Sequence, residues 1–258
     1  MQIQKDKMYA MLRKGMFGLF VVLDLFALKA CSGPEDPQET PVQQSNRIID
    51  FSGHQWLVRN SNNDKQGPGP NYFLDSEENV WVDDEGRLHL KIIKKEGIWY
   101  CSGISLLWSH GYNKYVMYAS SRLDQIDENA VAGFFVYGND TEEIDIEFSK
   151  WSKTENDNSQ FAVQPSSVVD NKFRFNMEME NGLSTHFFDW KPDRIEFASF
   201  NGHVDVSLEE PLNHWVYKGA DIPPDKEERL KINLWLFKGS SPSNNQEVEI
   251  IIDRIEIL

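Results

Sequence analysis

The stretch Glu142-Glu143-Ile144-Asp145-Ile146-Glu147-Phe148 decides the fold class of this sequence. Successive side chains of a β-strand point to opposite faces of its sheet, so a strand here has one acidic face and one apolar face. The acids are Glu143, Asp145 and Glu147, and the apolar residues are Ile144, Ile146 and Phe148. No lysine or arginine is interleaved, and adjacent like charges on one face repel. A solvated strand face is the alternative, but the repulsion favours a functional site.

The surrounding sequence also has the pattern of short strands. Residues 131–137 are apolar and aromatic throughout, which is typical of a central strand. Apolar and polar residues alternate over 88–92, 173–179, 195–199 and 248–252. A dozen or more short strands in one domain indicate an all-β sandwich or barrel.

Three local features add detail to this pattern. After 248–252 the alternation slips by one residue, which predicts a β-bulge near Asp253. The pair Asn201-Gly202 predicts a hairpin turn, because both residues tolerate a positive φ. Helix is expected only in short pieces, such as around residues 213–215.

Composition excludes some classes of function. The chain has 258 residues, 40% of them hydrophobic and 26% charged, which suits a globular protein with a full core. Acids outnumber bases by 41 to 26, for a net charge of −15. Nucleic acid is therefore excluded as the main partner, because phosphate binding needs a basic surface. Two cysteines cannot form a disulfide framework, and Cys101 is expected to be a buried thiol.

Residues 1–30 have the pattern of a secretory signal. Basic residues precede an apolar stretch at 16–28, which ends in Leu28-Lys29-Ala30-Cys31. This ending resembles a bacterial lipobox, in which the cysteine is lipidated, and a plain signal peptide is the alternative. We expect Cys31 to anchor the protein to a bacterial membrane as an outer-membrane lipoprotein of the cell envelope, periplasmic or surface-exposed. Residues 31–46 are polar and Pro-bearing, which predicts a flexible tether.

Three close carboxylates suit the hydrolysis of glycosidic bonds. A retaining mechanism needs a carboxylate nucleophile and a carboxylic acid about 5–5.5 Å apart. Residues i and i+4 of a straight strand have Cα atoms about 13 Å apart, but glutamates that lean together on a concave sheet close much of that gap. The charge of Asp145 raises the proton affinity of its neighbours and helps Glu147 to remain an acid. No metal-protease, phosphate-loop or serine-hydrolase motif is present.

The hexapeptide at 143–148 resembles the active-site signature of glycoside hydrolase family 16, a family of β-jelly-roll endo-glucanases and galactanases. The resemblance covers most of residues 48–258. Further similar segments follow in the family's order at 79–90, 103–115, 188–193, 232–235 and 252–253. The resemblance implies that residues 47–258 form a concanavalin A-like jelly-roll sandwich with a curved active-site sheet.

The resemblance also implies roles for the three acids. Glu143 matches the nucleophile, Asp145 the residue that assists it, and Glu147 the acid/base. The Glu-x-Asp-x-Glu spacing is similar to that of the lichenase and xyloglucan-active branches. The chain departs from the family at Thr141, where an aromatic residue or histidine is common, and at Ala162, where lichenases offer a polar side chain to the sugar. These departures leave the identity of the sugar open.

Residues that contact the sugar are expected around the acids, since flat rings stack on pyranose faces. The expected substrate-binding residues are Trp235, Trp151, Gln160, Gln164 and Asn71. We expect Trp56 and Trp190 to pack in the core instead.

No cofactor is required for this chemistry. Some members of the family hold a structural calcium on the convex side, and Asp253 matches the aspartate that binds it, with carbonyl groups near Asp50 and Gly86. A bulge residue that bonds to the backbone is the alternative.

These patterns together predict a retaining endo-β-glycanase that is anchored by lipid and acts on a β-linked polysaccharide, with a β-glucan as the first expectation. The alternatives are a glycan-binding surface lipoprotein without turnover and a structural surface lipoprotein without a glycan site. We expect a monomer whose partners are the polysaccharide and the membrane.

Overall fold

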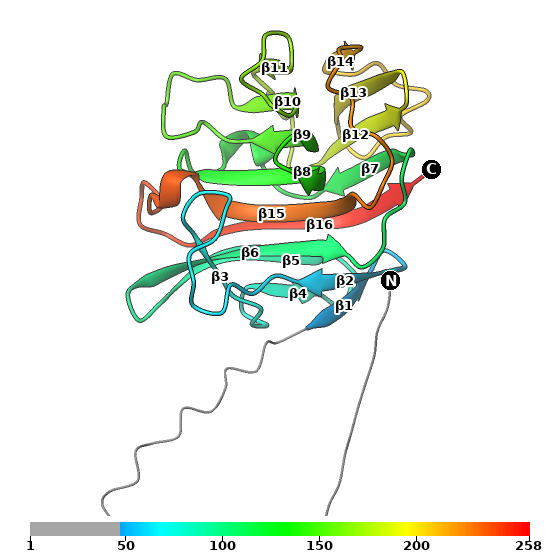
Figure 1. Cartoon of the computed structure of the whole chain (residues 1–258). Coiled ribbons are helices and arrows are strands. Elements are labelled where there is room, and N and C mark those ends of the chain that lie inside the picture. Colours follow the sequence, from blue (N-terminus) through cyan, green and yellow to red (C-terminus); the bar gives the residue numbers. More distant parts are fainter. Residues whose placement is uncertain (1–46) are drawn as a thin grey trace, which may run out of the picture. The chain divides into compact units, whose positions relative to one another are not determined.

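The computed structural model of the chain describes residues 47–258 (Figure 1). The predicted signal segment, the tether and Cys31 lie in residues 1–46, outside the described part. Within residues 47–258, no helix has the length and apolar character needed to cross a membrane.

The described residues form an all-β fold, as predicted. Sixteen strands belong to one curved sheet, whose main path is β11-β10-β9-β8-β15-β6-β5-β16-β7-β12-β13-β14. The elements are β1 (Ile48–Phe51), β2 (His54–Val58), β3 (Tyr72–Phe73), β4 (Val80–Val82), β5 (Leu88–Lys95), β6 (Ile98–Leu106), β7 (Lys114–Ala119), the short helix η1 (Leu123–Gln125), β8 (Ala130–Asn139), β9 (Glu142–Phe148), β10 (Ser159–Val163), β11 (Lys172–Phe175), β12 (Ser184–Lys191), β13 (Arg194–Asn201), β14 (Asn213–Tyr217), β15 (Arg229–Leu236), the short helix η2 (Phe237–Gly239) and β16 (Val248–Ile257).

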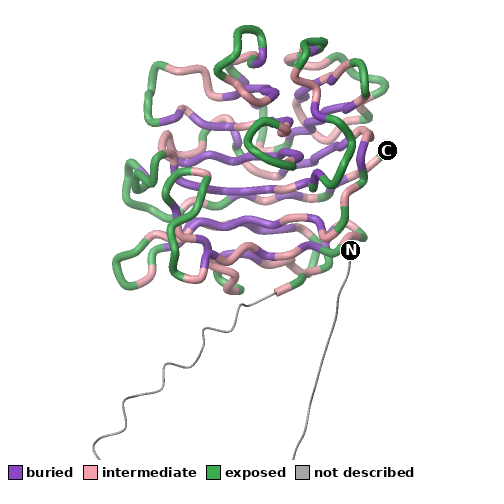
Figure 2. Tube along the Cα trace, in the orientation of Figure 1, coloured by how far each residue is buried: buried purple, intermediate pink, exposed green. Residues whose placement is uncertain are grey.

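The sheet folds back on itself at the hairpin between β5 and β6, where Lys95 pairs with Ile98. On one side of this hairpin, the first layer contains β2, β6, β15, β8, β9, β10 and β11. On the other side, the second layer contains β5, β16, β7, β12, β13 and β14 (Figure 1). This is the predicted jelly-roll sandwich. Most of the buried apolar residues form one core, and buried strands alternate with exposed loops along the chain in Figure 2.

The strands of the first layer have one core face and one polar face. On β15 the core side chains are Leu230, Ile232 and Leu234, and the opposite face carries Lys231, Asn233 and Trp235. On β9 the core side chains are Ile144, Ile146 and Phe148, and the opposite face carries the three acids. The alternation in the sequence therefore sets which side chains reach the outside of the first layer.

Aromatic rings join the two layers near β10 and β13. Phe161 of β10 is fully buried, and its ring centroid lies 4.6 Å from that of Phe175 and 5.2 Å from that of Phe197, which belongs to β13. Phe197 in turn stacks on Trp215 at 5.2 Å. Rings at these separations add to the stability gained from burial. The predicted burial of Trp56, Trp190 and Cys101 is confirmed.

Two local predictions are wrong and one is confirmed. The segment Asn213–Tyr217 is strand β14 and not a helix, because it pairs along the edge of β13. Asn201-Gly202 is not a tight hairpin, because Gly202 donates its N–H to Leu183 and the chain reaches β14 through residues 202–212. The bulge near Asp253 is confirmed by a register shift between β16 and β7 at that residue.

The aromatic contact between the layers can be tested by Phe161→Ala. We expect a loss of about 3–5 kcal/mol in the free energy of unfolding, because a large buried ring is removed. Val169→Ala is the control, since Val169 is 83% exposed and its loss should change stability by less than about 0.5 kcal/mol. Urea unfolding of both variants measures the difference, and equal midpoints would contradict the role of Phe161.

Candidate active site

Three acids on β9 form the centre of the candidate site. β9 lies between β8 and β10 in the first layer. Asp145 pairs with Phe135 of β8, and Glu147 pairs with Gly133. Because Gly133 has no side chain, the surface beside Glu147 stays low enough for a ligand to approach the carboxyl group.

A cleft of about 690 Å³ opens over these strands. It is lined by all three predicted catalytic residues and extends over β8, β15 and β6 to β2, where the Gly67-Pro68 turn forms a wall. This volume lies within the usual range for a small-molecule or sugar site. Other side chains of its lining are Arg59, Tyr137, Asp140, Lys231, Asn233 and Trp235.

The three carboxyl groups hold their protons unusually firmly. Burial raises the pKa of Glu147 to about 8. Burial also raises the pKa of Glu143 to about 7, although a hydrogen bond from Asp145 lowers it. Asp145 is 4% exposed, and burial and the charge of Glu143 raise its pKa well above the ordinary value. Asp145 therefore carries the proton in its hydrogen bond with Glu143.

Gln160 of β10 holds Glu147 in place. Its Nε2 donates to Glu147 Oε2 at 2.6 Å, and its Oε1 accepts from Arg174 Nε at 3.0 Å. Because an arginine nitrogen can only donate, the amide oxygen faces Arg174 and the amide nitrogen faces Glu147. The guanidinium of Arg174 lies 4.0 Å from the centre of the Trp151 ring. Trp151, predicted to bind sugar, is 6% exposed and instead supports the arginine that orients Gln160.

Gln164 holds Asp145 by the same device. Its Nε2 donates to Asp145 Oδ2 at 2.8 Å, and its Oε1 accepts the backbone N–H of Ser166 at 2.8 Å. The backbone donor fixes the orientation of the amide and presents its nitrogen to the carboxyl group. Both glutamines that the sequence assigned to substrate therefore contact the acids directly.

Of the remaining predicted residues, one lines the cleft and one does not. Trp235 lies in the cleft lining at the end of β15 and is 9% exposed. Asn71 is 4% exposed, and its Nδ2 donates to Pro68 O at 2.7 Å and to Leu236 O at 2.8 Å. Asn71 thus ties the wall of the cleft to β15, because both of its acceptors are backbone groups that flank the site.

Sequence reasoning missed the polar side chains that β2, β8 and β15 bring to the cleft. The sequence shows that Lys231 and Asn233 share a face with Trp235. It does not show that β15 pairs with β8, which brings that face into the cleft. Gly103 of β6 is needed here as well, since a Cβ atom on it would lie 2.2 Å from Asn233 Oδ1. The alternation of apolar and polar residues over 229–235 is the sequence signal that could have identified the side chains of β15.

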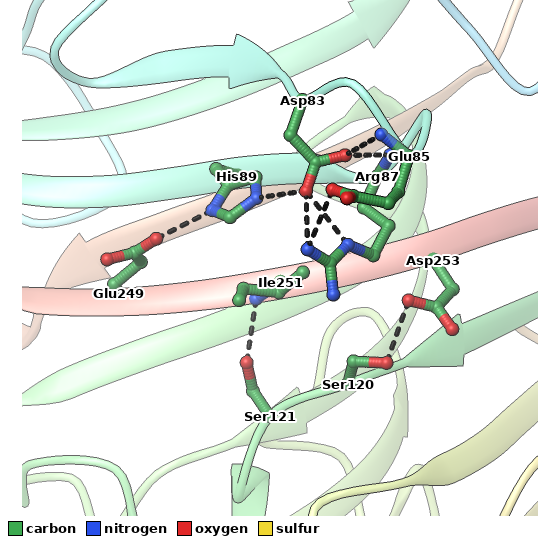
Figure 3. A network of polar contacts seen from close by, with 9 residues as sticks. All are labelled: Asp83, Glu85, Arg87, His89, Ser120, Ser121, Glu249, Ile251 and Asp253. Carbon is green, nitrogen blue, oxygen red and sulfur yellow. Dashed lines mark hydrogen bonds and ion pairs between the residues drawn. The ribbon is translucent and has the colours of Figure 1, made fainter.

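Asp253, predicted to bind calcium, lies on β16 in the second layer (Figure 3). Ser120 donates its hydroxyl to Asp253 Oδ1 at 2.7 Å, and His203 Nδ1 lies 3.2 Å from Oδ2. Both carboxylate oxygens have partners here, and calcium binding at Asp253 with carbonyl groups near Asp50 and Gly86 stays a prediction. Among residues 47–258, no group of three or more His, Cys, Asp or Glu side chains is placed to hold a metal.

Near Asp253, the carboxylate of Asp83 shows how neighbouring donors compensate a negative charge in this protein. The two ring nitrogens of His89 lie 2.6 Å from Glu249 and 3.0 Å from Asp83, and Arg87 donates to Asp83 at 2.8 Å (Figure 3). Burial raises the pKa of Asp83, but the hydrogen bonds from His89 and Arg87 outweigh it and hold that pKa below its usual value. Among the described residues, Glu143, Asp145 and Glu147 have no such ion pair, and burial moves their pKa values upward.

The fold is shared with known glucanases, although no protein-family model and no curated protein sequence matches this chain. A β-glucanase from Bacillus licheniformis has a TM-score of 0.60 at 18% identity, over 83% of this chain and 99% of that one. A family 16 glycosyl hydrolase from Mycobacterium smegmatis has a TM-score of 0.59 at 15% identity, over 79% and 91%. A Mycobacterium tuberculosis protein described as an immunostimulatory antigen and pseudo β-1,3-glucanase has a TM-score of 0.60 at 16% identity, over 79% and 90%. The chain therefore has the jelly-roll fold of family 16 glycosyl hydrolases.

The buried acids lead us to expect that Glu147→Gln stabilises the protein at alkaline pH. The raised pKa values mean that the stability contributed by Glu143 and Glu147 is complete below pH 4.5 and is lost as the pH rises through about 7 and 8. Glutamine avoids this loss at its own position. A gain of about 1 kcal/mol corresponds to about 2–4 °C in Tm.

Thermal unfolding across pH measures this effect, and the gain should disappear below pH 4.5. Glu142→Gln is the control on the same strand, because Glu142 forms an ion pair with Lys226 at 2.5 Å that holds its pKa down. This control should show no alkaline gain. A Glu147→Gln protein with the Tm of the wild type above pH 8 would contradict the burial of an uncompensated charge.

Proposed function

We propose that the protein is a family 16 glycoside hydrolase that cleaves a β-linked polysaccharide with retention of configuration. The observation that carries the proposal is the row of three acids in one cleft, with the pKa of Glu143 at about 7 and that of Glu147 at about 8. Two carboxyl groups in different protonation states are what this reaction requires. The β-glucanases among the structures with this fold support a β-glucan as the first substrate to test.

Between these two pKa values, Glu143 is ionised while Glu147 keeps its proton. Glu143 attacks the anomeric carbon, and the glycosidic oxygen takes the proton of Glu147 as its bond to that carbon breaks. Glu147, now a carboxylate, then takes a proton from a water molecule, whose oxygen attacks the anomeric carbon and displaces Glu143. Asp145 donates its hydrogen bond to Glu143 and steadies the carboxylate between the two steps.

The groups around the acids suit a neutral sugar ring next to Glu147. Gly133 leaves the floor open there, and Asn233 pairs with Gly133 from β15. The ring of Trp235 lies on the same face of β15 and offers a flat surface to a pyranose. These three residues form the proposed floor of the central sugar site.

The proposed location is the bacterial cell envelope, with the lipidated Cys31 as the membrane anchor. Support for it comes from the basic and apolar pattern of residues 1–30. One acyl chain binds a membrane only marginally, so the proposal includes the several chains of a bacterial lipoprotein. A polysaccharide outside the cytoplasm would be accessible to an enzyme held there.

A glycan-binding protein without turnover is the second candidate. One structure with this fold is described as a pseudo β-1,3-glucanase, so the fold is compatible with loss of activity. Thr141 and Ala162, where the chain departs from family 16, favour the same alternative. Reducing-sugar release beside affinity electrophoresis on a panel of β-glucans and β-galactans separates the two candidates.

The pH dependence of kcat/KM should be bell-shaped, with limbs near pH 7 and pH 8. Activity falls below the first value because Glu143 becomes protonated, and above the second because Glu147 loses its proton. Gln160→Leu removes a hydrogen bond that lowers the pKa of Glu147, so its alkaline limb should move to higher pH. An alkaline limb that stays in place would show that Gln160 does not act on Glu147.

The roles of the two glutamates can be separated by alanine variants and azide. Glu143→Ala should abolish hydrolysis of every substrate, because no glycosyl-enzyme forms. Glu147→Ala should slow polysaccharide hydrolysis by about 10²–10⁴-fold, while an aryl glycoside with a good leaving group still glycosylates Glu143. That intermediate should accumulate and be visible by mass spectrometry. Added azide should restore turnover and release a β-glycosyl azide.

Glu142→Ala is the matched control, because Glu142 lies on the same strand but pairs with Lys226 and Asn139 outside the cleft. It should retain wild-type turnover. An α-glycosyl azide from Glu147→Ala would indicate inversion and refute the assignment. Azide rescue of Glu143→Ala instead would mean that the two roles are exchanged.

A further inference from the structure

Two cations line the cleft on the side away from β10. Lys231 lies on β15, two strands from β9, and Arg59 follows β2, four strands from β9. At about 4.8 Å between strands, these positions lie about 10 Å and 19 Å from the acids. Both side chains are half-buried. They therefore sit beyond the reacting sugar, along the path that a glycan chain would take over β15, β6 and β2.

Among residues 47–258, neither cation forms an ion pair with a carboxylate. The neighbours that influence Arg59 are Cys101 and Tyr137, and neither carries a negative charge at neutral pH because the pKa of each is raised by burial. The Nζ of Lys231 lies 3.9 Å from the centre of the Tyr137 ring, and Glu143 is the acidic neighbour that acts on it. Burial lowers the pKa of Lys231 to about 8, and the charge of Arg59 lowers it further. Two cations that repel each other in a half-buried cleft cost stability, so stability does not explain them.

The guanidinium of Arg59 is held in place but left with free donors. It lies 3.7 Å from the centre of the Phe73 ring, and one of its nitrogens donates to Gly67 O in the wall of the cleft. The backbone N–H of Arg59 donates to Gly103 O at 2.9 Å. A guanidinium has five N–H donors, and the described residues accept from one of them. The fixed plane and the unused donors are the features of an arginine that recognises a planar or tetrahedral anion.

We propose that this part of the cleft, between Arg59 and Lys231, binds an anionic group on the substrate, so that the substrate is a β-linked glycan bearing sulfate esters or uronate carboxylates. The inference rests on the proposed function, because it assumes that a glycan chain occupies the same cleft. The net charge of −15 suggests a neutral substrate, but the local charge near β2 and β15 has the opposite sign.

One carboxylate lies near this part of the cleft. Asp140 is exposed at the rim and accepts the hydroxyl of Tyr137 at 2.9 Å. It forms no ion pair with Arg59 or Lys231, and it is not among the groups that shift the pKa of either cation. Glu143 is the acid of β9 that acts on Lys231, but it forms no ion pair with Lys231 or Arg59 in the structure and contacts the reacting sugar in the proposed mechanism. The two cations are therefore left to an external anion.

The test compares matched pairs of glycans that differ only in charge. One pair is a sulfated β-galactan and its desulfated form, and the other is a uronate-bearing β-glycan and its carboxyl-reduced form. Affinity electrophoresis measures binding, and reducing-sugar release measures hydrolysis. We expect the wild type to bind the charged member of at least one pair about tenfold or more tightly, because hydrogen bonds to charged groups are the stronger kind. High salt should abolish this preference.

Arg59→Gln and Lys231→Gln should each reduce the ratio of affinities for the charged and neutral members by about tenfold. Lys218→Gln is the matched control. It also removes one positive charge, but Lys218 is exposed and directly follows β14 in the second layer. Its ratio should equal that of the wild type. Which pair shows the preference identifies sulfate or carboxylate as the group that is bound.

The outcomes separate this inference from the proposed function. Hydrolysis of neutral glycans with no preference for any charged member would overturn the inference and leave the hydrolase proposal in place. Salt-sensitive binding of a charged glycan that depends on Arg59 and Lys231, without hydrolysis, would support the inference and overturn the hydrolase. Equal ratios for Lys231→Gln and Lys218→Gln would also overturn the inference.

Discussion

The burial of three carboxyl groups on one face of β9 is the constraint on which the rest of the site depends. Alternation places Glu143, Asp145 and Glu147 together, and the apolar residues between them anchor the strand in the core. No ion pair within the described part of the chain compensates these acids, whereas Asp83 in the second layer has both His89 and Arg87. The consequence is a set of acids that keep protons near neutral pH, which is a cost in stability and a requirement of acid catalysis.

The neighbouring strands supply what holds these acids without neutralising them. Gln160 and Gln164 each present an amide nitrogen to one carboxyl group, because a fixed donor occupies the amide oxygen. A neutral amide positions a carboxylate and lowers its pKa less than a cation in the same place would. The positive charges of the cleft lie farther away, with Arg59 directly after β2 and Lys231 on β15. The cleft thus separates the proposed region of bond cleavage from the proposed site for an anionic substituent.

The strand at 142–148 and its two faces could be predicted from the sequence, because period-two alternation reports burial within a single strand. The jelly-roll fold could be predicted from the resemblance of residues 143–148 to family 16. The cations Arg59 and Lys231 could not, since they reach one cleft only through the order β9-β8-β15-β6-β2, which joins distant parts of the chain. Trp151 shows a second limit. Its residue type fits sugar stacking, but its contact with Arg174, which no local pattern reveals, makes it a support for the site.

The claim that buried acids keep their protons near neutral pH can be measured without any substrate. A ¹³C NMR titration of protein labelled at its glutamate carboxyl carbons follows each group directly. Two glutamate signals should titrate near pH 7 and pH 8, and they should disappear in Glu143→Gln and Glu147→Gln respectively. If every glutamate signal instead titrates near the ordinary value of 4.5, the acids of β9 are ordinary solvated side chains and the account is wrong.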